Sequence, residues 1–275
     1  MRVPRPLLQP GDQEVLAHAV IRLEQSNFAV RLAEYAGQPI NRVLGALPRV
    51  ANDRIRAAVH AAMLRCLRVA ISSLETKSLR RPSSLRPKVV SGLAGGVSGF
   101  VGLAALPIEL PVTTTNMLRA IAEVARAEGE DLGDRRTQIA CLEVFALGRR
   151  EGGVGTDAGY YALRAMLARA TGDAVGYLVQ RGVAEETAPV LMRFATEVAT
   201  RYGFVVSERA AASAVPLIGA IGGAAINWIF MDYFQEIARG HFAIRRLERQ
   251  YGAEPVRAVY QEVVRRMEAR QAKKK

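Results

Sequence analysis

The sequence has few of the residues that define disulfide-rich and metal-binding proteins. Its 275 residues include two cysteines, three histidines and one tryptophan. Two cysteines are too few for a disulfide-stapled secreted domain, and a 50% apolar composition is too high for a disordered chain. Prolines at positions 4, 6 and 10 interrupt the apolar run that a secretory signal requires. We therefore expect a protein of the reducing cytoplasm, with Cys66 and Cys141 buried as small apolar side chains.

Sequence motifs for metal, nucleotide or nucleophilic chemistry are also missing. The histidines form no HExxH pattern and lie near no CxxC, and no Gly-Lys pair offers a Walker A loop. Residues 153–158 fit a relaxed GxGxxA pattern, but they follow a predicted helix, whereas dinucleotide binding requires a preceding strand. We therefore expect neither a metal nor a cofactor.

The spacing of apolar residues predicts helices along almost the whole chain, and no strictly alternating run indicates a strand. From Asp53 onward, apolar residues fall on one side of a helix, and Arg54, Arg65 and Arg68 fall on the other. Pro255 marks the first turn of a last helix. We predict an all-α protein, a single multi-helix bundle over residues 1–275 with flexible ends at about 1–10 and 269–275.

Two glycine-rich segments without charge, residues 89–108 and 210–231, interrupt the amphipathic pattern. Each is long enough to span a bilayer, which takes roughly 20 residues, but each is only moderately apolar. Small residues four apart give a helix a flat face for close packing, and six glycines fit this role: Gly92, Gly95, Gly96, Gly99, Gly219 and Gly223. Two interpretations of these segments stay open: they are buried core helices, or they insert into a membrane. For membrane insertion, we favour peripheral or shallow contact with the bilayer over full spanning.

The net charge of +12 comes mainly from residues 1–88 and 232–275. Near an anionic membrane each Lys or Arg contributes about 1 kcal/mol to binding. We expect contact with the cytoplasmic face of the membrane through Lys77, Arg80, Arg81, Arg86, Lys88, Lys273, Lys274 and Lys275. Nucleic acid is a less suitable partner, because the basic residues are spread over many helices and few aromatics lie among them. A homo-oligomer, and a cytoplasmic protein without membrane contact, stay as alternatives.

The block from Pro107 to Arg119 holds the strongest candidates for chemistry. Glu109 lies between two prolines, which we expect to interrupt regular helix, so that Thr113 or Thr114 caps the helix carrying Arg119. A carboxylate in an apolar setting can transfer protons. A hydrolase or transferase site at Glu109 and Arg119, completed by Asp232 or His241, is therefore an alternative function. The structural alternatives are a Glu109 paired with a basic neighbour and a core His241 held by one hydrogen bond.

Several blocks together resemble the EcsC protein family from about Phe28 to Gly252. They are residues 106–121, 129–132, 141–148, 201–208, 214–227, 234–235, 238–242 and 246–248. The resemblance implies a bacterial helical protein whose namesake is encoded beside the components of an ABC transporter. It supplies no established reaction and no catalytic residues. With the charge pattern, it leads us to expect a non-enzymatic, membrane-associated protein with a transporter-linked membrane-protein partner.

Overall fold

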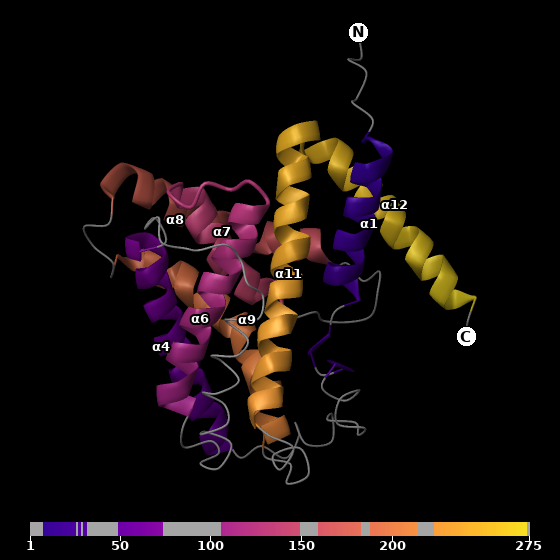
Figure 1. Ribbon diagram of the computed structural model, residues 1–275. Coiled ribbons are helices and arrows are strands. Elements are labelled where there is room, and N and C mark those ends of the chain that lie inside the picture. Colours follow the sequence, from indigo (N-terminus) through magenta and orange to yellow (C-terminus); the bar gives the residue numbers. More distant parts are fainter. Residues whose placement is uncertain are drawn as a thin grey trace.

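Eight α-helices make up the described part of the chain in this computed structural model (Figure 1). The structure describes residues 8–25, 27, 28, 30, 31, 49–73, 106–148, 159–182, 188–213 and 223–273. The helices are α1 (Pro10–Glu24), α4 (Arg49–Ser73), α6 (Leu106–Ala127), α7 (Arg135–Leu147), α8 (Tyr160–Arg181), α9 (Pro189–Ser213), α11 (Gly223–Tyr251) and α12 (Ala253–Ala272). No strand occurs within these ranges, which confirms the all-α prediction. That the whole chain is a single domain stays a prediction.

The 29-residue α11 is the axis of the bundle and is about 43 Å long at 1.5 Å per residue. In Figure 1 it stands between α1 and α12 on one side and the remaining helices on the other. Aromatic rings of α7, α9 and α11 meet at its inner face, with Phe234 within 5.5 Å of Phe145 and of Tyr202, centroid to centroid. Gly252, at φ +88°, follows the last residue of α11 and allows the chain to turn there, because glycine adopts this conformation without steric cost.

Helix α4 has the two faces that its sequence predicts. Ile55, Val59, Met63, Cys66 and Ala70 are buried against α6 and α9. The three predicted surface arginines of α4 are exposed. Cys66 and Cys141 are buried free thiols, and burial raises the pKa of Cys66 to about 12. The apolar spacing was therefore sufficient to orient this helix correctly.

The prediction that prolines interrupt the helix around Glu109 is wrong, because α6 runs without a break from Leu106 to Ala127 with Pro111 inside it. Pro107 lies in the first turn, where a missing N–H costs nothing, and Pro111 removes only one bond of the second turn. The prediction that Thr113 or Thr114 caps a helix is therefore also wrong, because both lie inside α6. Thr114 and the neighbouring Thr115 bond to the backbone of α6 instead. Their hydroxyls donate to carbonyls four residues earlier, each at 2.7 Å.

Residues 89–105 and 214–222 of the two charge-free segments lie outside the described residues. Residues 210–213 end α9, residues 223–231 begin α11, and residues 106–108 begin α6. Gly92, Gly95, Gly96, Gly99 and Gly219 lie outside the described ranges, as do seven predicted membrane-contact residues: Lys77, Arg80, Arg81, Arg86, Lys88, Lys274 and Lys275. Within the described ranges, none of the helices is long and apolar enough to cross a bilayer.

Candidate functional site

Glu109 is held in a buried polar cluster where α6, α9 and α11 meet. Its carboxylate forms an ion pair with Arg209 of α9, and both side chains are at most 10% exposed. The Asn227 amide of α11 donates to the same carboxylate oxygen at 3.2 Å, and the Thr113 hydroxyl donates at 3.4 Å. The Arg209 guanidinium also lies 5.2 Å from the centre of the Phe230 ring. The ion-paired alternative for Glu109 is therefore confirmed, and the cluster joins three helices.

The other three residues proposed around Glu109 occupy separate places. Arg119 is exposed on α6, ten residues and so about 15 Å along the helix from Glu109. Asp232 forms an ion pair with Arg31 at 3.1 Å. His241 follows Asp232 on α11 by nine residues, about 13 Å. The structure therefore does not bring the four residues together around one reacting point.

His241 is a core histidine held by one hydrogen bond, as the structural alternative predicts. Its Nδ1 lies 2.9 Å from the Tyr160 hydroxyl, and its Nε2 is buried without a hydrogen-bond partner. Burial, with positive charge from Arg164 and Arg245, lowers its pKa well below 6.5. The ring is therefore neutral at physiological pH. Arg164 bonds both the Tyr160 hydroxyl and Glu248 of α11, so the polar network links α8 to α11.

Glu24 is a buried carboxylate that the sequence reasoning missed. It accepts hydrogen bonds from the backbone N–H of Tyr160, at 3.1 Å, and from the hydroxyl of Tyr260. Glu24 lies on α1, Tyr160 begins α8 and Tyr260 lies on α12. A carboxylate at the start of α8 also complements the helix dipole. This residue therefore fixes both terminal helices to the bundle, and no local sequence pattern announces such a contact.

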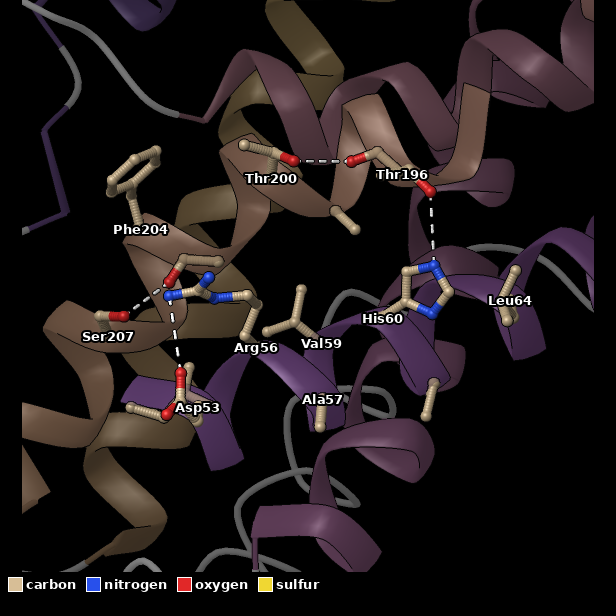
Figure 2. A pocket seen from close by; sticks show the side chains of 14 residues that line it. Asp53, Arg56, Ala57, Val59, His60, Leu64, Thr196, Thr200, Phe204 and Ser207 are labelled. Carbon is tan, nitrogen blue, oxygen red and sulfur yellow. Dashed lines mark hydrogen bonds and ion pairs between the residues drawn. The ribbon is translucent and has the colours of Figure 1, made fainter. Parts of the chain in front are cut away.

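A groove of about 1030 Å³ lies between α4 and α9 (Figure 2). Its floor is apolar and includes the buried residues Ile55, Val59 and Ala199. Figure 2 shows Thr196 near His60 and Leu64 at one end, and Phe204 and Ser207 near Arg56 at the other. The lining covers residues 53–64 of α4 and 196–207 of α9, so the groove is about 16 Å long along each helix.

The hydroxyls in the groove already have acceptors on their own helix. Thr196, Thr200 and Ser207 each donate to the carbonyl four residues earlier, at 2.8 Å. These three hydroxyls therefore do not need a polar ligand as their acceptor. Arg56 is its one lining arginine, with 81% of its side chain exposed and only a 3.7 Å contact to Asp53. An exposed pair of this kind is weak and leaves the guanidinium open to another anion.

Three more arginines line the solvent face of α4 beside the groove. Arg54, Arg65 and Arg68 are exposed, and their helical positions place them within about 60° of one another around the axis. They extend over 14 residues, about 21 Å. We call these three residues the arginine stripe. The stripe follows from the sequence of α4, whereas the groove was not predicted. Small residues three or four apart on α9, at 196, 199, 203 and 207, are the sequence signal for such a shallow surface.

Taken together, these features define an all-α protein with buried structural polar clusters, an apolar surface groove and a basic helix face. The chain belongs to the EcsC protein family, whose model matches residues 31–247. No curated protein and no solved structure gives a significant match. In the described ranges, no three His, Cys, Asp or Glu side chains are grouped so that they could hold a metal ion.

Proposed function

We propose that this protein is a non-enzymatic peripheral membrane protein whose α4 face binds anionic lipid on the cytoplasmic side. The observation that carries the proposal is the arginine stripe. Arg54, Arg65 and Arg68 face solvent on one helix without an acidic residue among them, and Asp53 is the one acidic residue of α4. Such a face attracts anionic headgroups over about a Debye length, roughly 8 Å at physiological salt.

Arg54 and Arg65 form no ion pair within the described part of the chain, and this favours α4 over α12 as the contact face. Helix α12 also exposes arginines, but Glu262 pairs with both Arg265 and Arg266, at 2.8 and 2.9 Å. These ion pairs reduce the positive potential that α12 presents. The basic residues that the sequence predicts as membrane contacts at 77–88 follow α4 in the sequence and lie outside the described ranges.

A structural role is sufficient to explain the buried positions of Glu109 and His241. Glu109 contacts Arg209 of α9 and Asn227 of α11, and His241 contacts Tyr160 of α8, so each takes part in a contact between helices. We therefore infer that the protein acts through its surface and not through a buried site. A membrane-protein partner near a transporter, which the family resemblance implies, would bind the protein at that membrane.

Vesicle sedimentation tests the proposal. Full-length protein is mixed with vesicles of phosphatidylcholine alone or with 30% phosphatidylglycerol, at low and high salt. We expect sedimentation with the anionic vesicles only and release by salt. The triple variant Arg54→Gln, Arg65→Gln, Arg68→Gln removes three charges at about 1 kcal/mol each, so its affinity should fall about 100-fold or more.

The matched control removes the same charge from α12, through Arg265→Gln, Arg266→Gln and Arg270→Gln. This variant has the same net charge as the α4 triple variant. It should keep most of its affinity for anionic vesicles if the position of the arginines determines binding. Equal losses in the two triple variants would show that total charge, and not the α4 face, governs binding. Wild-type protein that stays in the supernatant with anionic vesicles would contradict membrane binding and favour a cytoplasmic interaction protein.

A further inference from the structure

We infer that Ile108 and Val112 of α6, which we call the apolar pair, insert into the headgroup region of the anionic membrane that the arginine stripe contacts. Arg119 of α6 acts there as a further cation. The inference rests on the proposed function, because the same bilayer is the partner. It adds a second helix and an apolar contact to what would otherwise be attraction between charges alone.

The apolar pair faces solvent one turn apart on α6. Ile108 is 80% exposed and Val112 is 43% exposed. Their neighbour Glu109 directs its carboxylate inward to Arg209 of α9, so this charge is withdrawn from the surface. Removing one branched apolar side chain from water improves binding by about tenfold or more. The pair can therefore contribute to binding wherever it leaves water.

Helices α4 and α6 lie side by side and run in the same direction (Figure 1). Arg135, which begins the helix after α6, donates to the carbonyl of Ile71 near the end of α4, at 2.9 Å. Both helices therefore end at the same end of the bundle. Cys66 of α4 hydrogen-bonds with Thr115 of α6, so these two residues mark the sides on which the helices face each other.

The stripe and the apolar pair face the same side of these two helices. Viewed from its N-terminal end, a right-handed helix advances clockwise by about 100° per residue. On α4, the stripe arginines lie about 100–160° counterclockwise of Cys66. On α6, the apolar pair and Arg119 lie about 20–60° clockwise of Thr115. Because the helices are parallel and face each other, these opposite rotations lead to one common surface.

Along the helix axes, the apolar pair lies within the span of the stripe. From the contact between Cys66 and Thr115, the pair lies about 4–11 Å toward the N-terminal ends, and Arg54 lies about 18 Å in the same direction. The other two stripe arginines lie within about 3 Å of that contact, and Arg119 lies about 6 Å beyond it. Cations therefore flank the apolar pair in both directions.

This pattern selects an anionic bilayer as the partner. Two exposed apolar side chains are far fewer than the roughly 20–30 residues a side of a stable protein interface. A bilayer takes up single apolar side chains, and cations beside them attract its anionic headgroups. Glu123, one turn beyond Arg119, is close to Arg126, which offsets its charge.

Two double variants test the surface without changing the charge. Ile108→Gln with Val112→Gln removes the apolar pair. Met166→Gln with Val179→Gln is the matched control, because it removes two exposed apolar side chains from α8, which packs on α7 and α9. With full-length protein and vesicles containing 30% phosphatidylglycerol, the first variant should bind at least tenfold more weakly, and the control should bind like wild type. Melting curves identify any variant that fails to fold.

A fluorescent label measures insertion directly. Cys66 and Cys141 are buried, so a cysteine introduced at an exposed position reacts selectively. Ile108→Cys and Met166→Cys are each labelled with an environment-sensitive dye and mixed with the same vesicles. We expect the dye at position 108 to shift its emission to the blue and to be quenched by spin-labelled lipid. The dye at position 166 should emit as it does in water.

The outcomes separate this inference from the proposed function. Sedimentation with anionic vesicles without any change of the dye at position 108 would overturn insertion and leave binding through the stripe standing. Insertion of the dye that is equally strong when the three stripe arginines are replaced by glutamine would keep the apolar contact and overturn the role of the stripe. Wild type that sediments with no vesicles would overturn both.

Two further results would assign the apolar pair to another contact. Self-association that is lost in Ile108→Gln with Val112→Gln, while vesicle binding is unchanged, would show that a second copy of this chain covers the pair. A dye at position 108 that is already shielded from water without vesicles would show that the chain itself covers it. Either result would overturn the inference.

Discussion

The buried ion pair between Arg209 and Glu109 allows a sharp test of how α6, α9 and α11 are held together. The perturbation is Arg209→Met, which keeps an unbranched side chain and removes the guanidinium. The Glu109 carboxylate, whose side chain is only 10% exposed, then keeps two neutral donors, the Asn227 amide and the Thr113 hydroxyl. Breaking a buried pair by removing one partner costs about 3–5 kcal/mol, because it leaves a charge that is neither paired nor well hydrated.

The free energy of unfolding, measured by urea denaturation with circular dichroism, should fall by this amount. Adding Glu109→Gln to Arg209→Met should restore most of the loss, because a neutral amide replaces the unpaired charge. Arg265→Met in the exposed pair with Glu262 is the matched control and should cost less than about 1 kcal/mol. A loss below 1 kcal/mol in Arg209→Met, or no recovery in the double variant, would refute the assignment of a buried charge pair.

Two further predictions follow from other contacts. Gly148→Ala should destabilise the protein by about 1–3 kcal/mol in melting experiments, because its Cβ would lie 2.6 Å from a phenyl carbon of α11, whereas Gly176→Ala meets nothing within 4 Å and should be neutral or stabilising. His241 stays neutral in the fold while the unfolded chain gains a proton as the pH falls below its ordinary pKa of 6.5, so the wild type should lose up to about 1.4 kcal/mol of stability per pH unit there. His241→Gln lacks this loss, and a stability difference between the two proteins that is the same at pH 6 and pH 5 would contradict the lowered pKa.

The helical class and the faces of the helices were readable from the sequence, because both depend on local periodicity. On α4, the apolar residues from Ile55 to Ala70 are buried and the three stripe arginines are exposed, as their spacing predicts. The helix break that we expected at Pro111 does not occur, and the reason is also local. A proline in the second turn removes one hydrogen bond, and the packing of α6 against α4 and α11 outweighs that loss.

The polar contacts could be predicted only in part, because they join residues far apart in the chain. The sequence indicated that Glu109 would have a basic partner and that His241 would lie in the core, since both follow from apolar surroundings. It could not identify Arg209, which is 100 residues from Glu109, or Tyr160, which is 81 residues from His241. Nor did it show that α4 and α9 leave a groove, since a groove depends on which two helix faces meet.

The extent of the family match bears on where function lies in this chain. The match ends at Leu247, four residues before α11 ends, and it leaves out α1 and α12. These two helices pack on each other and on α11, and Glu24 joins them to Tyr160 at the start of α8. The arginine stripe and the groove lie wholly within residues 31–247, on α4 and α9. A surface shared by the family should therefore be sought on α4 and α9, while α1 and α12 cover one side of α11 and contribute stability.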